Sequence, residues 1–349
     1  MQTTKYALVL PKIGAERSLF LGENKVKALA ESKTVADFVS QLRDTPYQEQ
    51  ISRLSAPLSG RNLERAFREN LIETYLKITK YAPEQANRYL NVYLSRFESE
   101  NVKTLIRAAH AKLPSEQRLA RLYLQVERYF DNFEVVEEAA KASSIAGVVQ
   151  AFKGTEYESA LNLGFKSFQE TDSTTTMDVF VDTLFYEKHF SAYQSLPRRE
   201  KRHAYFYASI QNDSFILLTL LRGKNLNYDP NWLRLAVPHC FFNLEKKQVE
   251  SIVSALNFEA AYKIVEDSYY AKYFTRRETP EETIAQAEKA FHTAMLARAK
   301  KSRIREIFNI GSTLAFVTLK EAEVYNLTAI SLGVDGGMSP EAIKERLLF

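Results

Sequence analysis

The chain has 349 residues, enough to bury one large core or several medium ones, which excludes a single small fold stapled by disulfides. Its 47 basic and 43 acidic side chains leave a net charge of +4, so charge alone does not demand a nucleic-acid partner. The single cysteine, Cys240, excludes an internal disulfide framework and fits a reducing compartment.

The composition favours helices. Eleven glycines and ten prolines are few for this length, and the abundant Leu, Ala, Glu, Lys, Arg and Gln lose little side-chain entropy in a helix. No apolar stretch is long enough to span a bilayer, and no signal-peptide core follows Met1–Lys5. We therefore expect a soluble, cytoplasmic, all-α protein that acts at a membrane only from outside.

The predicted elements follow apolar spacing along the chain. One helix is marked by Leu63, Ala66, Phe67, Leu71, Tyr75 and Ile78. A single helix is predicted after Pro83, marked by Leu90, Tyr93, Leu94, Phe97, Val102, Leu105 and Ile106. Residues 170–176 are predicted to form a solvated loop. The same apolar spacing returns at Val181, Leu184 and Phe185 and at Leu217, Leu220 and Leu221, and Gly333–Gly337 are predicted to form a helix-ending loop.

Two short sequence patterns, which we call landmarks, recur along the chain. Residues 35–47 resemble residues 145–157, 110 positions later, and a weaker third copy is placed at 249–256, a further 104 positions on. Residues 98–107 recur at 213–222 and 323–332, at offsets of 115 and 110. Agreement between the landmarks indicates one unit used three times.

Each unit of about 110 residues is much longer than the roughly 33 to 47 residues of helical solenoid repeats, so it can hold its own core. We predict three helical lobes side by side. They cover residues 1–126, 127–236 and 237–349, with breaks guided by Pro114 and Pro238.

The third copy carries a resemblance to a known family. Lys320–Ile330, then Gly333, then Glu341–Leu347 resemble the C-terminal signature of the C subunit of archaeal-type (A/V-type) ATP synthases, which is related to the d subunit of the eukaryotic vacuolar proton pump. Leu42–Tyr47 and Glu98–Arg107 are similar to that family's first repeat, and the resemblance covers essentially the whole chain. Three departures are Thr328 in place of a usual Arg, Ile216 in place of Asn, and a less regular N-terminal segment at Pro11–Arg17.

The resemblance implies a funnel of three lobes around a pseudo-threefold axis. Such a protein is a non-catalytic connector of the central stalk, present as one copy in a hetero-oligomeric complex. It links the D- and F-type rotor shaft subunits to the membrane proteolipid ring, at the cytoplasmic face, and transmits torque for proton or sodium transport. It needs no cofactor, metal or nucleic acid. The alternatives are a helical adaptor that binds nucleic acid or acidic proteins, and a helical enzyme whose site is assembled from distant residues.

The repeated polar positions are candidate framework or interface residues. Glu98 and Asn101 lie three apart on one helix face, as do Glu323 and Asn326. They form either buried polar pairs that fix helix packing or the lining of the funnel. Arg107 ends an apolar helix, and so does Arg222 in the next copy, where a cation suits the helix dipole, an ion pair or a partner.

Two basic stretches complete the candidates. The first runs from 298 to 305 and contains Arg298, Lys300, Lys301 and Arg303; the second is Arg198–His203. Each is interpreted as a solvated face, or as a contact for acidic loops or anionic headgroups.

Catalytic signatures are missing from the sequence. No phosphate-binding Gly-x-x-x-x-Gly-Lys-Ser/Thr pattern occurs, and the five histidines lie too far apart for a local zinc motif. Cys240 is predicted to be a small core residue. The sequence thus predicts a protein that is not an enzyme.

Overall fold

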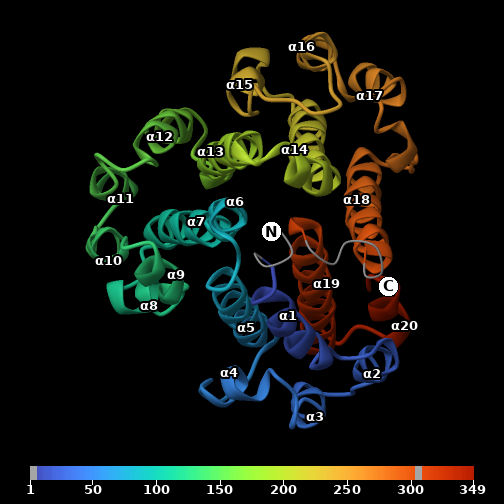
Figure 1. Ribbon diagram of the computed structural model, residues 1–349. Coiled ribbons are helices and arrows are strands. Elements are labelled where there is room, and N and C mark those ends of the chain that lie inside the picture. Colours follow the sequence, from blue (N-terminus) through green and yellow to red (C-terminus); the bar gives the residue numbers. More distant parts are fainter. Residues whose placement is uncertain (1–5, 303–308) are drawn as a thin grey trace. The chain divides into compact units, whose positions relative to one another are not determined.

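The computed structural model describes residues 6–302 and 309–349, and these residues form helices and no strands (Figure 1). The all-α prediction is confirmed. None of the helices in the described ranges combines the length and apolar character needed to cross a bilayer.

The helices vary in length from one turn to the 28 residues of α14. The first ten are α1 (Val9–Ser18), α2 (Glu23–Leu29), α3 (Val35–Ser40), α4 (Gln48–Ser52), α5 (Gly60–Thr79), α6 (Glu84–Leu94), α7 (Arg96–His110), α8 (Ser115–Leu119), α9 (Leu124–Tyr129) and α10 (Phe133–Lys141). The others are α11 (Ile145–Ala151), α12 (Glu158–Thr171), α13 (Thr174–Ser195), α14 (Arg198–Asn225), α15 (Pro230–Leu235), α16 (Lys246–Ser254), α17 (Phe258–Glu266), the 3₁₀ helix η1 (Ala271–Tyr273), α18 (Pro280–Ser302), α19 (Ile310–Asp335) and α20 (Pro340–Lys344).

The helices fall into two compact units, both discontinuous in sequence. Unit 1 comprises Met1–Asn87, Pro197–Ala204 and Phe291–Phe349, and unit 2 comprises Arg88–Leu196 and Tyr205–Ala290. The predicted lobe boundaries at 126 and 236 are a different division of the chain and stay predictions.

Unit 1 is organised around α19, which packs on α5 and is also contacted by α1, α2, α3 and α20 (Figure 1). The six apolar residues that predicted α5 are all buried in it. Its first residue, Gly60, lies so close to α19 that an added Cβ would be 2.8 Å from the Ser331 carbonyl oxygen. The glycine therefore permits the close approach of the two helices.

Unit 2 contains a core formed by α7 and the helices that follow it. Here α7 packs on α13, and α13 packs on α12. The buried apolar side chains include Val102, Leu105 and Ile106 of α7 together with Val148 and Phe152 from the next copy of the landmark. Segments about 50 residues apart in sequence thus share one core.

Two predicted elements differ from the structure. The helix predicted after Pro83 is two helices, α6 and α7, interrupted at Ser95, whose hydroxyl donates to the Val92 carbonyl at 2.8 Å. The loop predicted at 170–176 is wrong, because only Asp172 and Ser173 separate α12 from α13. Asp172 has a left-handed backbone (φ 52°), which lets the chain reverse in two residues.

Three long helices share one ending, which among the described residues also closes α9 at Asp131. The backbone is left-handed at Lys112, Asn227 and Gly337, which are 115 and 110 residues apart. In each case the next residue donates its N–H to a carbonyl five positions back, at 3.0, 2.9 and 2.9 Å, to the carbonyls of Ala108, Gly223 and Gly333. This is the Schellman ending of α7, α14 and α19, and a short helix (α8, α15, α20) follows each. The loop predicted at Gly333–Gly337 is therefore confined to Gly336 and Gly337, because α19 continues through Gly333 to Asp335.

One turn also occurs three times. A capped short helix (α3, α11 or α17) is followed by a hydroxyl residue. This residue donates to the carbonyl three positions back and accepts from the N–H of a tyrosine two positions on. The hydroxyl and tyrosine pairs are Thr45 and Tyr47, Thr155 and Tyr157, and Ser268 and Tyr270.

These turns correct the third copy of the first landmark. The predicted copy at 249–256 falls on α16 and the loop after it, whereas the repeated geometry begins at the cap of α17, Asn257, whose side chain accepts the Ala260 N–H at 3.0 Å. The capping side chains of the first two copies are Thr34 and Ser144. Asn replaces a hydroxyl residue at this cap, and both types accept the same bond.

Candidate functional site

The two repeated features meet in pairs, which we call the acid–tyrosine joints. An acidic residue on the long helix of one copy faces the turn tyrosine of another copy. The joints are Glu98 with Tyr157, Asp213 with Tyr270, and Glu323 with Tyr47. Each pair brings together two different predicted lobes, and the last connects the third to the first.

At the Glu323 joint the acid is paired with a cation. The Tyr47 hydroxyl donates to Glu323 Oε1 at 2.5 Å, and Lys320 Nζ lies 3.2 Å from the same oxygen and 2.7 Å from the Tyr47 hydroxyl. The Leu21 N–H donates to Oε2 at 2.5 Å. Burial lowers the pKa of Lys320, and the Glu323 carboxylate opposes that shift. A buried ion pair with these hydrogen bonds therefore holds the joint.

At the Asp213 joint the acid is surrounded by donors. It accepts from the Tyr270 hydroxyl at 2.8 Å, from the N–H groups of Phe242 and Asn243 at 3.1 and 2.7 Å, and from Asn212 Nδ2 at 3.2 Å. Burial raises the pKa of Asp213, and these four hydrogen bonds oppose the shift. The loop that follows α15 is thereby fixed to α14.

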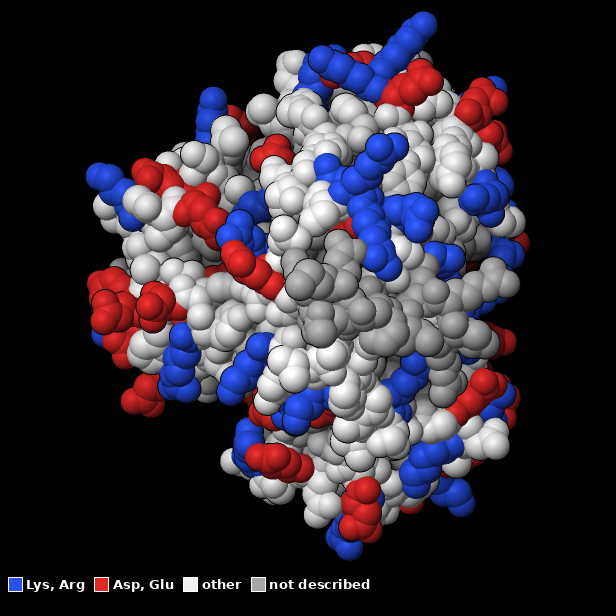
Figure 2. Space-filling view, viewed as in Figure 1, with Lys and Arg blue, Asp and Glu red and all other residues white. Residues whose placement is uncertain are grey.

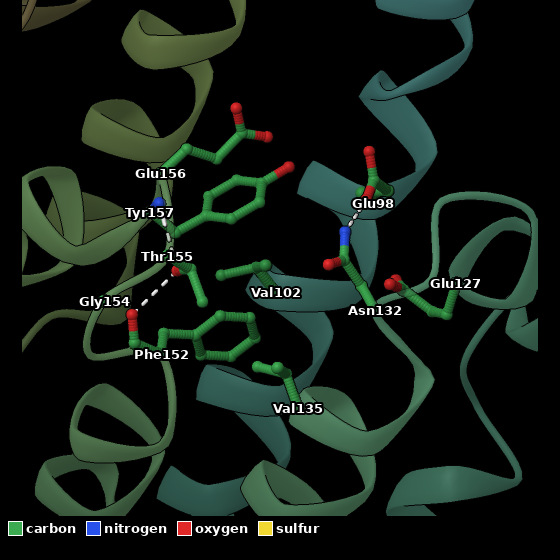
Figure 3. A pocket seen from close by; sticks show the side chains of 10 residues that line it. All are labelled: Glu98, Val102, Glu127, Asn132, Val135, Phe152, Gly154, Thr155, Glu156 and Tyr157. Atoms are coloured by element: carbon green, nitrogen blue, oxygen red, sulfur yellow. Dashed lines mark hydrogen bonds between the residues drawn. The ribbon is translucent and has the colours of Figure 1, made fainter.

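At the Glu98 joint the contact is indirect. Within the described part of the chain, Asn132 is the one donor to Glu98, at 2.7 Å from Oε1. The Tyr157 hydroxyl lies 3.4 Å from Ser99 Oγ, and Glu98 and Tyr157 both line a pocket of about 260 Å³ (Figure 3). Glu98 is 3% exposed, and the Asn132 hydrogen bond reaches only Oε1 of its carboxyl group.

Asn101 and Asn326 make the same contact in two copies. Asn101 Nδ2 donates to the Tyr123 carbonyl at 3.3 Å, and its Oδ1 accepts the Tyr123 N–H at 2.8 Å. Asn326 does the same with Leu348, at 2.9 and 2.8 Å, and in both cases the partner is 22 residues further on. Both amides are buried, and each joins its helix to the backbone of a segment 22 residues further on.

Arg107 and Arg222 form half-exposed ion pairs. Arg107 Nε lies 3.0 Å from Asp178 Oδ2, and Arg222 lies 2.6 Å from Glu288 Oε2. The pairs connect α7 to α13 and α14 to α18. At this exposure each contributes about 0–1 kcal/mol.

The basic candidates lie on the surface. Lys300 and Lys301 are exposed and Arg298 is half-buried, whereas Arg303 lies outside the described residues. Figure 2 shows acidic and basic side chains mixed over most of the visible face, with acidic ones gathered over α10. For all ten candidate residues, contact with a partner molecule stays a prediction.

The described residues contain no group of three or more His, Cys, Asp and Glu side chains arranged to hold a metal ion. Cys240 is half-buried, with its thiol 3.7 Å from Asn212 Oδ1 and its carbonyl accepting from Asn212 Nδ2 at 2.8 Å. Burial raises the pKa of the Cys240 thiol to about 12, so it is protonated at neutral pH.

Sequence reasoning identifies the acid of two joints and misses Asp213 and the three tyrosines. Glu98 and Glu323 stand out by their repetition, but the tyrosines do not, although a Thr-x-Tyr signal precedes α4 and α12. Tyr270 is missed because the third copy is placed at 249–256. Glu127, which accepts from Asn101 at 2.6 Å, carries no signal of its own.

The fold and the joints define the class of this molecule: an all-helical protein in which α7, α14 and α19 share one ending and each has an acid that faces a turn tyrosine. A family model described as ATP synthase (C/AC39) subunit matches residues 9–346, and the chain belongs to that family. The resemblance noted in the sequence is thereby confirmed.

The relatives extend over nearly the whole chain. The C subunit of the A-type ATP synthase of Methanocaldococcus jannaschii is 26% identical over 98% of this chain and 86% of its own length. The corresponding protein of Thermococcus kodakarensis is 24% identical, over 98% of this chain and 90% of the relative. That of Methanothermobacter thermautotrophicus is 23% identical, over 97% and 86%.

Proposed function

We propose that this chain is a non-catalytic connector in the central stalk of a rotary A/V-type ATP synthase. It links the rotor shaft, made of D- and F-type subunits, to the membrane proteolipid ring and transmits torque during proton or sodium transport. It sits peripherally at the cytoplasmic face, as one copy per complex. Family membership over residues 9–346 supports assignment to such a complex.

The proposed mechanical role rests mainly on the joint between Glu323 and Tyr47. It connects the third copy of the landmark to the first, after the other two joints have connected the first to the second and the second to the third. The closed collar of three lobes that the resemblance implies is part of this proposal. A closed collar of packed helices transmits rotation because protein interiors have low compressibility.

Contacts with the partners are expected to be numerous and individually modest. A proteolipid ring whose copy number differs from three cannot offer equivalent sites to three lobes. Torque is then carried by shape and by many contacts rather than by one anchor. The exposed Lys300 and Lys301 are candidate contacts for acidic loops.

The test is deletion and restoration in the native membrane complex. Without the chain, the catalytic head should still hydrolyse ATP, but hydrolysis should no longer drive ion uptake into vesicles. Restoring the wild-type chain should restore coupling, and quantification should give one copy per complex. Coupled transport in the complete absence of the chain contradicts the proposal.

A second measurement separates the connector from a nucleic-acid adaptor. The purified chain should show no salt-dependent binding to duplex DNA or RNA. An adaptor would lose affinity steeply with salt, with a log–log slope of roughly one unit per phosphate neutralised. Tight, salt-sensitive binding would favour the adaptor.

A further inference from the structure

The three acid–tyrosine joints differ in how the negative charge of the acid is balanced. Glu323 has the ammonium group of Lys320, and Asp213 has four hydrogen-bond donors. Glu98 has the Asn132 amide alone among the described residues. Burying a carboxylate that has one neutral donor costs much more free energy than burying a neutral carboxyl group.

The Glu98 joint also differs from the other two because a second buried acid, Glu127, lies beside it. Glu127 on α9 is 1% exposed and accepts from the Asn101 amide at 2.6 Å. It lines the same pocket as Glu98, with Asn132 between the two acids, and the Tyr157 phenol points towards them from the opposite wall (Figure 3). Within residues 6–302 and 309–349, neither acid has a cation among its hydrogen-bond partners.

The charged groups around the pocket do not neutralise the pair. Glu156, which also lines the pocket, forms an ion pair with Lys188 of α13. Lys188 lowers the pKa of Glu98 and Glu156 raises it, but burial has the largest effect and raises that pKa to about 7. Burial, with a further contribution from Glu98, raises the pKa of Glu127 to about 8.

We propose that the Glu98 joint is operated by protons: it is closed while the Glu98 and Glu127 carboxyl groups are neutral, and it opens to water when they become carboxylates. Two like charges in a buried pocket repel each other and recruit hydration. The pocket of about 260 Å³ gives water a place to enter. The segments expected to loosen are α9 and α10, which carry Glu127 and follow Asn132.

The sign of the pH effect follows from linkage. Both acids have folded-state pKa values above the ordinary value of about 4.3, so the folded state holds more protons than the unfolded state between that pH and about 8. The stabilisation by the neutral acids is complete below about pH 4.3 and is lost as the pH rises through 7 and 8. This inference concerns the chain itself and does not depend on the proposed function.

The first test detects the protons directly. Infrared spectra of the purified full-length chain should show the C=O stretch of buried carboxylic acids at pH 6, and the band should disappear with midpoints near 7 and 8. The double variant Glu98→Gln, Glu127→Gln should lack this titrating band. Glu116→Gln, which changes an exposed glutamate on α8, should retain it.

The second test measures the opening. Amide hydrogen exchange across α9 and α10, corrected for the intrinsic effect of pH, should be severalfold faster at pH 9 than at pH 6 in the wild type. The double variant keeps the acceptor oxygens without the charge, so its corrected rates should be equal at the two pH values. Glu116→Gln should behave as the wild type does.

Either of two results would overturn the proposal: both acids already ionised at pH 6, or the same pH-dependent exchange in the double variant and the wild type. If the double variant does not fold, the single variants Glu98→Gln and Glu127→Gln supply the comparison, each removing one step of the titration. The infrared comparison of each single variant with the wild type then decides whether the acids are neutral at pH 6, because Asp178, whose pKa burial raises to about 6, also contributes to the band of the wild type.

Discussion

At the scale of single residues, the three copies carry an acid at the same position, but the charge of each acid is compensated in a different way. Glu98, Asp213 and Glu323 are 115 and 110 residues apart, and each faces a turn tyrosine. What differs is the source of compensation for the buried acid. The cation, the set of donors and the proton are three ways of avoiding an unpaired buried charge.

Tyr47→Phe tests the closing joint. The substitution removes the hydroxyl that bonds both Glu323 and Lys320 in a fully buried site, leaving their polar atoms under-satisfied. We expect a loss of about 1–3 kcal/mol in the free energy of unfolding, measured by chemical denaturation. Tyr129→Phe is the matched control, because Tyr129 is 42% exposed and bonds Asn91 at the surface; it should change stability by less than about 0.5 kcal/mol. Equal effects of the two substitutions would argue against a structural role for the joint.

At the scale of elements, α5 and α19 are held together by a close backbone approach. The Gly60 N–H donates to Asp335 Oδ2 at 2.9 Å, and the missing side chain of Gly60 leaves room for the Ser331 carbonyl. Ser59 caps the same helix through the Asn62 N–H at 3.3 Å. The N-terminus of α5 is thus fixed both locally and by a residue 275 positions away.

Gly60→Ala should push the two helices apart. Its Cβ would meet backbone atoms of Ser331 and Leu332 at 2.8 and 2.9 Å, so we expect destabilisation of about 1–3 kcal/mol in thermal or chemical unfolding. Gly14→Ala is the control: it lies in α1 with no atom within 4 Å of the added Cβ, and alanine should stabilise that helix by about 0.5–1 kcal/mol. A neutral Gly60→Ala would mean that the approach of α5 and α19 is not tight in solution.

At the scale of the whole chain, cores are formed by segments distant in sequence. Unit 1 contains α5 near the start of the chain and α19 near its end, and the apolar face of α5 is buried largely against α19. The predicted first lobe, residues 1–126, contains α5 but lacks α19. Removing α19 would expose most of that buried face to water.

A fragment of residues 1–126 should therefore fail to fold cooperatively on its own. We expect poorly dispersed amide signals in NMR spectra and a broad, shallow denaturation curve, while the full-length chain unfolds in a sharp transition. Well-dispersed signals and a sharp transition for the fragment would show that the predicted lobe is an autonomous domain.

Much of the secondary structure could be predicted from local sequence. The face of α5 followed from the spacing of Leu63, Phe67 and Leu71, because a helix buries every third or fourth residue. The break at Ser95 and the two-residue turn at Asp172 could not be predicted, because each depends on one backbone contact or one left-handed residue. The third turn at Ser268 and Tyr270 was hidden because its cap is Asn257 rather than a hydroxyl residue.

Composition and the spacing of apolar residues were enough to predict the helical class, and the resemblance of the chain to ATP synthase C subunits was enough to identify the family. The division into three lobes stays a prediction. The role of the repeated polar residues became visible only in the contacts of the folded chain. Glu98, Asn101, Glu323 and Asn326 look alike as Glu-x-x-Asn pairs. Apart from Lys320, which lies three residues before Glu323 on α19, their hydrogen-bond partners lie 22 to 302 residues away. Spacing along one helix carries no information about those distant partners or about burial.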